Sequence, residues 1–128
     1  MMTRLTTHVL DISRGVPAAG VNVQLWHLRE SPVLVAEAVT NADGRLDQPL
    51  LDGDADAGVY ELMFAVRDYF RKQPDGPTDK LAAEPTAGGW AFLEQVPVRF
   101  RLGNADSESH YHIPLLVAPG GYSTYRGS

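Results

Sequence analysis

Short runs in which apolar and polar residues alternate recur along the chain, and turn-forming residues separate them about every ten positions. Side chains two positions apart on a strand share a face, so alternation of this kind is typical of strands with one buried face. The clearest runs are Val21 to Trp26, Val59 to Val66, Val96 to Leu102 and His110 to Val117. Many short strands at this spacing predict an all-β sandwich.

Four further strands are predicted between turns, which brings the total to eight: Leu5–Asp11, Val33–Val39, a short strand from Arg45, and Tyr122–Ser128. Met1 to Arg4 are expected to precede the first strand. The segment from Gln73 to Gly89 is rich in Pro, Gly, Ala and charge, and we interpret it as a long loop. Such a loop is either a lid or a solvated excursion, and the general behaviour of loops favours the second.

Composition limits the kind of protein this is. At 128 residues the chain is expected to form a single domain over residues 1–128. There are no cysteines, which excludes disulfides and thiol nucleophiles and is compatible with a cytoplasmic protein. The net charge of −5, without a basic stripe, argues against binding to nucleic acid or to an anionic membrane. No apolar run is long enough to cross a membrane, and the alternating residues after Met1 lead us to expect no signal peptide.

The last two strands are expected to form a hairpin around the turn Ala118-Pro119-Gly120-Gly121. With the turn centred between Pro119 and Gly120, the numbers of two paired residues add up to about 239. Pro114 then lies opposite Tyr125, and His112 lies opposite Gly127. A slip of one residue would reverse the faces.

Histidines occupy the outward faces of two predicted strands. Ile113, Leu115 and Val117 are expected to face the core, which turns His110 and His112 outward. In the first strand His8 shares the outward face with Thr6 and Leu10, while Leu5, Thr7 and Val9 face the core. Arg45 follows the turn residues Asp43 and Gly44, which would hold its side chain at a sheet end.

Three segments resemble a known family. They are Leu5-Thr6-Thr7-His8-Val9-Leu10-Asp11 with the following Arg14-Gly15-Val16-Pro17-Ala18, then His110-Tyr111-His112-Ile113-Pro114-Leu115-Leu116, and the tail Tyr125-Arg126-Gly127-Ser128. The chain is similar over Leu5 to Ser128 to the 5-hydroxyisourate hydrolases of the transthyretin-like proteins. The paired histidines and the tail distinguish these hydrolases from transthyretin itself.

The resemblance implies a transthyretin-like β-sandwich of two four-stranded sheets plus one short helix, at Asp68 to Lys72. It implies an enzyme of urate breakdown that hydrolyses 5-hydroxyisourate, a cyclic amide, to 2-oxo-4-hydroxy-4-carboxy-5-ureidoimidazoline. It also implies a homotetramer, a dimer of dimers that meet across the sheets carrying the histidines, and no cofactor.

The positions that match the family's functional residues are His8, Arg45 and His112, expected to be catalytic. His8 and Arg45 are also expected to bind substrate, together with Tyr125 and the Ser128 terminus. Histidine suits proton transfer because its pKa lies near 6.5, and arginine suits a planar anion because its guanidinium makes bidentate contacts. Each of these residues taken alone would more often be an ordinary surface residue.

Several alternatives remain at this stage. His110 and His112 are spaced as a metal pair, but suitable partners are missing from the sequence, so we expect no metal site. His27 has no partner in sequence and is interpreted as structural. A transthyretin-like module that binds an apolar ligand, or a non-catalytic scaffold, would use the same fold without chemistry.

Overall fold

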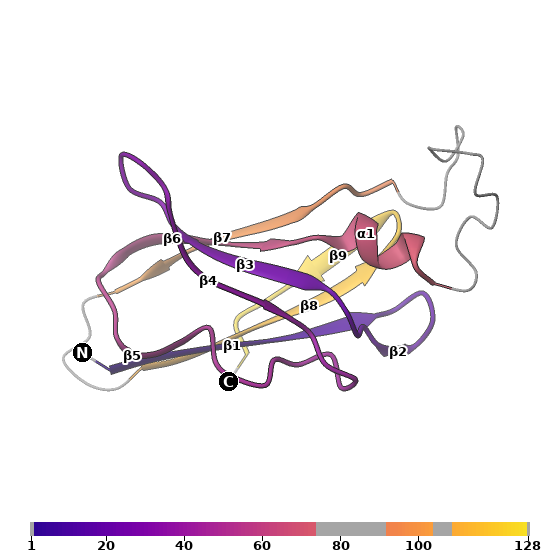
Figure 1. Ribbon diagram of the computed structural model, residues 1–128, viewed down its shortest axis with the longest axis horizontal. Coiled ribbons are helices and arrows are strands. Elements are labelled where there is room, and N and C mark those ends of the chain that lie inside the picture. Colours follow the sequence, from indigo (N-terminus) through magenta and orange to yellow (C-terminus); the bar gives the residue numbers. More distant parts are fainter. Residues whose placement is uncertain (1, 74–91, 104–108, 128) are drawn as a thin grey trace.

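The computed structural model describes residues 2–73, 92–103 and 109–127. The elements lie in two sheets with one short helix between β6 and β7 (Figure 1). In chain order they are β1 (Met2–Asp11), β2 (Val16–Pro17), β3 (Asn22–His27), β4 (Val33–Val39), β5 (Leu51–Asp54), β6 (Gly58–Phe64), α1 (Val66–Arg71), β7 (Val96–Leu102), β8 (Ser109–Ala118) and β9 (Gly121–Thr124).

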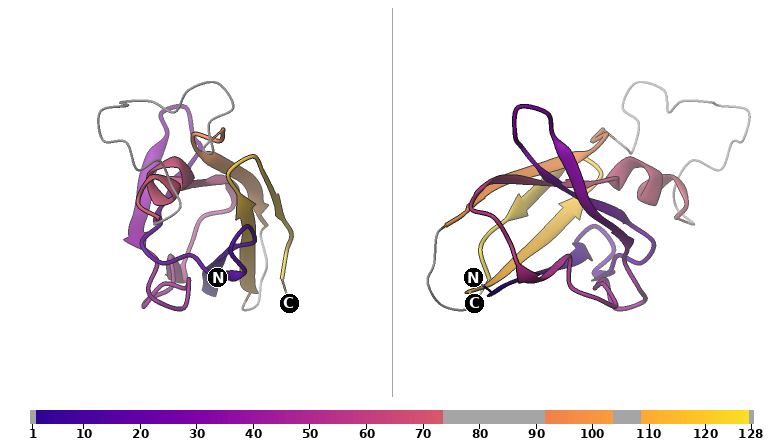
Figure 2. Two further views of the ribbon diagram at one scale, coloured as in Figure 1. Left: turned by 90° about the vertical axis from the view of Figure 1, so that its right-hand side faces the viewer. Right: turned by 60° about the vertical axis from the view of Figure 1, so that its left-hand side comes forward.

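The two sheets form the layers of a sandwich (Figure 2). One sheet has the order β2-β1-β8-β9, with β5 paired to β1 as well, and the other has the order β4-β3-β6-β7. β1 and β8 run parallel, and all other neighbours are antiparallel. The predicted β-sandwich with a short helix is confirmed.

The alternating pattern predicted the buried faces. Leu5, Thr7 and Val9 of β1 are buried, and Tyr60, Leu62 and Phe64 of β6 meet them in the core. β8 buries Ile113, Leu115 and Val117, as expected. Burying side chains of this size contributes about 1.5–3 kcal/mol each, so this shared core holds the two sheets together.

The prediction of two four-stranded sheets is wrong for the first sheet, which has five strands. The expected strand from Arg45 is a single bridge between Arg45 and His8, and the strand beside β1 is β5 instead. β5 reads Leu-Asp-Gly-Asp, and Asp and Gly are depleted in strands, so propensity gave no signal for it. The dipeptide β2 is too short to show alternation.

The expectation that the residues up to Arg4 precede the first strand is also wrong. β1 begins at Met2, because Met2 to Leu5 pair with β5 and Thr3 onward pairs with β8. The helix starts two residues before the predicted Asp68, with Val66 as its first residue. Val66, Tyr69 and Phe70 are all buried, which is the helical spacing of one apolar face.

Of the expected Gln73–Gly89 loop, only Gln73 lies within the described residues. Among the described residues, no helix is long and apolar enough to cross a membrane.

Candidate active site

The parallel pairing of β1 and β8 builds one wall of the candidate site. In its register Arg4 pairs with His110, Thr6 with His112 and His8 with Pro114. Because the faces alternate, the outward side chains of both strands form two adjacent rows. The Oγ1 of Thr6 lies 2.8 Å from Nδ1 of His112 and 3.3 Å from Nε2 of His110.

A tight turn after β4 brings Arg45 to His8. The Oδ1 of Asn41 accepts hydrogen bonds from the backbone N–H groups of Asp43 and Arg45. Gly44 has φ +75°, and its carbonyl accepts a hydrogen bond of 2.8 Å from the N–H of Val9. Arg45 then bridges to His8 across the sheet edge. A Cβ at Gly44 would lie 2.4 Å from the carbonyl oxygen of Val9, so the turn requires glycine.

The chain's tail reaches the same site from the other side. Gly127 bridges to His112, and its N–H donates a hydrogen bond of 2.6 Å to the carbonyl oxygen of His112. This pairing confirms the predicted hairpin register, which placed Gly127 opposite His112. A Cβ at Gly127 would lie 2.8 Å from Cδ2 of the His112 ring, so the missing side chain lets the tail approach the imidazole.

A hollow of about 500 Å³ lies over this face. Its lining holds two guanidinium groups and two imidazoles, and no carboxylate is found among the described lining residues. The lining is Arg4, Thr6, Thr7, Arg45, Leu46, Gln48, His110 and His112. In a chain with net charge −5, this local excess of cationic groups favours an anionic ligand.

The surroundings of His8 and His112 favour the neutral form of each ring. Burial lowers the pKa of His112 below 6.5, and the positive charge of Arg45 lowers it further. Burial and Arg45 likewise lower the pKa of His8, against a hydrogen bond to the backbone of Asp43 that raises it. Neutral imidazoles beside a permanent cation can accept a proton near pH 7, as a general base must.

The structure brings together three of the residues that the sequence singled out: His8, Arg45 and His112. His8 is close enough to both others to act on them electrostatically, although it does not line the hollow itself. Tyr125 is not brought to this hollow. It is 60% exposed and lines a second, apolar pocket with Val98, Phe100, Arg101, Tyr111, Ile113, Thr124 and Arg126. Ser128 lies outside the described residues.

Sequence reasoning missed Thr6 and Arg4 as site residues. Thr6 was placed on the outward face, but nothing local in the sequence shows that its neighbour is 106 positions away. The sequence pattern places Arg4 before the first strand, so it does not predict that this side chain lies at the site. No group of three or more metal-ligating side chains is found in the described part of the chain. His27, interpreted as structural, stacks on Tyr60 with ring centroids 4.2 Å apart.

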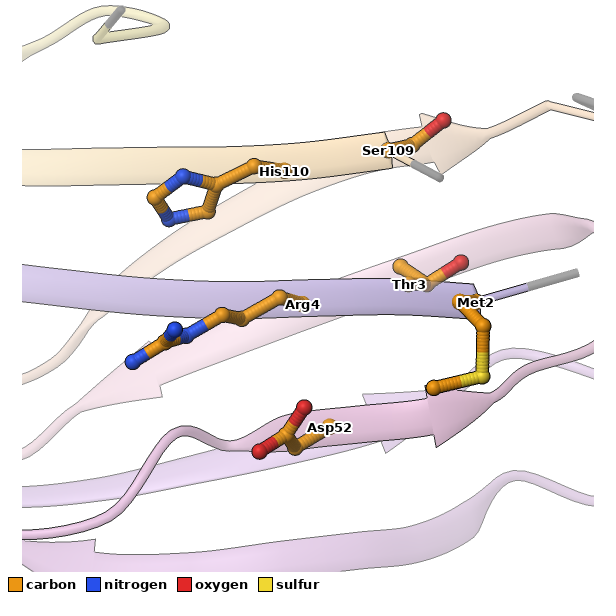
Figure 3. A pocket seen from close by; sticks show the side chains of 6 residues that line it. All are labelled: Met2, Thr3, Arg4, Asp52, Ser109 and His110. Carbon is orange, nitrogen blue, oxygen red and sulfur yellow. The ribbon is translucent and has the colours of Figure 1, made fainter. Parts of the chain in front are cut away.

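Next to the hollow lies a pocket that shares Arg4 and His110 with it (Figure 3). Figure 3 shows the guanidinium of Arg4 and the ring of His110 extending in the same direction from neighbouring strands. Asp52 of β5 lines this pocket beside Arg4, its partner in the sheet. The polar face therefore continues beyond the hollow along β1 and β8.

This arrangement can be compared with known proteins. The model of the HIUase/Transthyretin family matches residues 5–127. The chain belongs to the HIUase/transthyretin family. The matched range includes His8, Arg45 and His112.

Members of the family resemble the chain over its whole length. It is 53% identical to the 5-hydroxyisourate hydrolase of Halalkalibacterium halodurans, with 100% of each chain covered. It is 37% identical to the structure of Klebsiella pneumoniae 5-hydroxyisourate hydrolase, with a TM-score of 0.74 and 99% and 100% of the two chains covered. The structure of sea bream transthyretin in complex with thyroxine, at 24% identity and a TM-score of 0.75 over 97% and 94% of the chains, shares the fold.

Proposed function

We propose that this protein hydrolyses 5-hydroxyisourate. The observation that carries the proposal is the meeting of His8, Arg45 and His112 on one polar face, in a chain that matches 5-hydroxyisourate hydrolases along its full length. The reaction opens the six-membered ring at its amide. Water supplies a hydroxyl to the carbonyl carbon, the carbon–nitrogen bond breaks, and the leaving nitrogen takes a proton, which gives the ureidoimidazoline carboxylate.

Arg45 is proposed to bind the substrate through its guanidinium. The side chain is exposed at the hollow, and its backbone is held by the turn and by the bridge to His8. A guanidinium donates in a planar fork, which fits the coplanar carbonyl groups of the substrate. The same positive charge can stabilise the oxyanion that forms when water adds to the amide.

His8 and His112 are proposed to transfer the protons. The reaction needs a base to take a proton from water and an acid to give one to the leaving nitrogen. The lowered pKa values of the two histidines support the first role, because both rings are neutral near pH 7. One ring can serve as base and then as acid within a turnover, while the other positions the attacking water.

Tyr125 and Ser128 are proposed to bind substrate. The support for this is the contact of Gly127 with His112, which carries the tail to the hollow. In a single chain Tyr125 borders the apolar pocket.

We further propose that the protein forms a homotetramer in which the histidine-bearing sheets of two dimers face each other. We also propose that it is located in the cytoplasm. The outward face of β1 and β8 carries Leu10 and Leu116 directly opposite one another, both only partly buried in the single chain. Apolar side chains on a sheet face favour contact with another surface. The absence of cysteine from the sequence is compatible with a reducing compartment.

Hydrolysis can be tested directly with freshly prepared 5-hydroxyisourate, whose decay is followed by ultraviolet absorbance with and without the protein. The uncatalysed decay is the baseline. We expect a rate that increases in proportion to protein concentration and a product with the spectrum of the ureidoimidazoline. Decay at the baseline rate would refute the proposal and leave the ligand-binding module and the scaffold as explanations.

A further inference from the structure

One hydroxyl lies between the two histidines of β8. Thr6 points outward from β1, half-buried, with His112 as its direct partner in the sheet and His110 two positions before it. Its Oγ1 is within hydrogen-bonding distance of Nδ1 of His112, at 2.8 Å, and of Nε2 of His110, at 3.3 Å. A hydroxyl has one proton to donate and can accept, so it can join these two rings in a single chain of hydrogen bonds.

The protons in this chain of hydrogen bonds can be arranged in two ways, which differ in the direction of donation. In the first, Nδ1–H of His112 donates to Thr6 and Thr6 donates to Nε2 of His110. This leaves Nε2 of His112 unprotonated, and that atom has no hydrogen-bond partner among the described residues. In the second, Nε2–H of His110 donates to Thr6 and Thr6 donates to Nδ1 of His112, so Nε2 of His112 carries a proton. The tautomers of the two rings are therefore coupled through Thr6.

We propose that Thr6 is a positioning residue that sets the tautomer of His112, and that reversal of the chain lets Nε2 of His112 first accept and then donate a proton. This inference rests on the proposed hydrolysis. As Nε2 takes a proton from the attacking water, the Nδ1 proton passes to Thr6 and the proton of Thr6 passes to His110. When the carbon–nitrogen bond breaks, Nε2 gives its proton to the leaving nitrogen and the chain returns to its first direction.

His110 is placed to hold the extra proton between these steps. Its side chain is exposed, so water can solvate an imidazolium there better than at the partly buried His112. The carboxylate of Asp52 and the guanidinium of Arg4 line the same pocket as His110 (Figure 3). His112 faces Arg45 and His8 as well, and both disfavour a charge on its ring.

The experiment compares Thr6→Val, which keeps the shape but removes the hydroxyl, with Thr6→Ser, which keeps the hydroxyl. The readouts are kcat, KM and the imidazole nitrogen chemical shifts of His112 in proton–nitrogen correlation spectra. We expect Thr6→Val to lower kcat about 10-fold or more with little change in KM, a part of the usual effect of acid–base catalysis. Thr6→Ser should stay within about 3-fold of the unmodified protein, and in Thr6→Val the His112 ring should change to a mixture of tautomers.

Thr3→Val is the matched control on the same strand, because the buried hydroxyl of Thr3 has no hydrogen-bond partner among the described residues. It should change neither kcat nor the spectrum of His112. A fourth variant, His110→Ala, should have lower activity by itself but should add little to the loss in Thr6→Val, since the two residues act in one chain of hydrogen bonds. Thr6→Ala serves in the same way if valine prevents folding.

Unchanged kcat and unchanged His112 shifts in Thr6→Val would overturn the inference. So would equal losses in Thr6→Val and Thr6→Ser, which would show that shape and not the hydroxyl matters. If the unmodified protein fails to hydrolyse 5-hydroxyisourate, the proposed function falls. The nitrogen shifts then still decide whether Thr6 sets the tautomer of His112, because they need no turnover.

Discussion

At the scale of single residues, the site depends on keeping imidazoles neutral beside a permanent cation. Burial is the largest cause of the lowered pKa of both His8 and His112, and Arg45 is the next. An unfolded histidine takes up its proton near pH 6.5. Between that pH and the lower folded pKa, the unfolded chain binds more protons, so the free energy of unfolding contributed by these groups falls as the pH falls.

Replacing Arg45 by glutamine should separate the two causes. Without the guanidinium, the pKa of His8 and of His112 should rise toward 6.5 but stay below it, because burial remains. Titration of the histidine ring protons by NMR from pH 4 to pH 8 measures both values without needing activity. Arg14→Gln removes the same charge in the turn after β1 and is the control, because Arg14 is not among the groups that shift the pKa of either histidine. Unmoved midpoints in Arg45→Gln would show that the guanidinium does not act on these rings.

Alanine in place of His8 or of His112 should lower kcat about 100-fold or more, as general acid–base catalysis typically contributes. Both variants should fold, since neither ring is part of the buried core. Steady-state kinetics with 5-hydroxyisourate and a thermal melt measure the two effects. His27→Ala is the contrasting variant. His27 is buried against Tyr60, so this substitution should lower the stability of the protein. Turnover at the unmodified rate in either site variant would remove that residue from the mechanism.

At the scale of elements, the Gly44 turn couples the fold to the site. Alanine there adds two costs, the positive φ and a Cβ 2.4 Å from the carbonyl oxygen of Val9. Gly15 has a similar φ of +71° but open space around it, so Gly15→Ala isolates the first cost. Urea unfolding measures the loss in the free energy of unfolding. We expect a loss of about 1 kcal/mol for Gly15→Ala and of about 3 kcal/mol or more for Gly44→Ala. Equal losses of unfolding free energy in the two variants would show that the turn rearranges to accommodate the methyl group.

The tail at Gly127 is the second segment whose backbone lies close to a site residue, here the ring of His112. In Gly127→Ala the new methyl group would meet the ring of His112, so the imidazole has to move or the tail has to detach. We expect kcat to fall about 10-fold or more with an unchanged melting temperature, since displacement of a catalytic group is costly. Gly120→Ala in the hairpin turn is the control. Its new methyl group would meet no atom within 4 Å, so kcat should not change. Normal kinetics in Gly127→Ala would mean that the tail contact has no part in catalysis.

At the scale of the whole molecule, the proposed tetramer makes the outward face of β1 and β8 an interface. A charge at Leu116 should then break the contact between dimers, because an unpaired buried charge is costly. Light scattering after gel filtration should give four times the 14.0 kDa chain mass for the unmodified protein and half of that for Leu116→Glu. Val39→Glu, on the exposed edge strand β4, should remain tetrameric. A monomeric unmodified protein would contradict the assembly.

The sequence predicted what depends on neighbouring positions. Alternation gave the buried faces, and the turn at Pro119 gave the register that sets His112 opposite Gly127. It could not predict contacts that depend on which strands become neighbours. The parallel pairing of β1 with β8 places Thr6 between two histidines, and β5 beside β1 draws Met2 and Arg4 into the sheet. The catalytic roles of the site residues stay predictions.

The parallel pair also bears on how the protein is made. β1 emerges from the ribosome first, but the residue that pairs with Thr6 is synthesised 106 positions later. Until then one edge of β1 has no partner, and an unpaired edge is a template for aggregation. The four strands of the other sheet are nearer to their partners in sequence. A nascent chain can therefore assemble that layer first, while this edge of β1 stays unpaired until β8 has been synthesised.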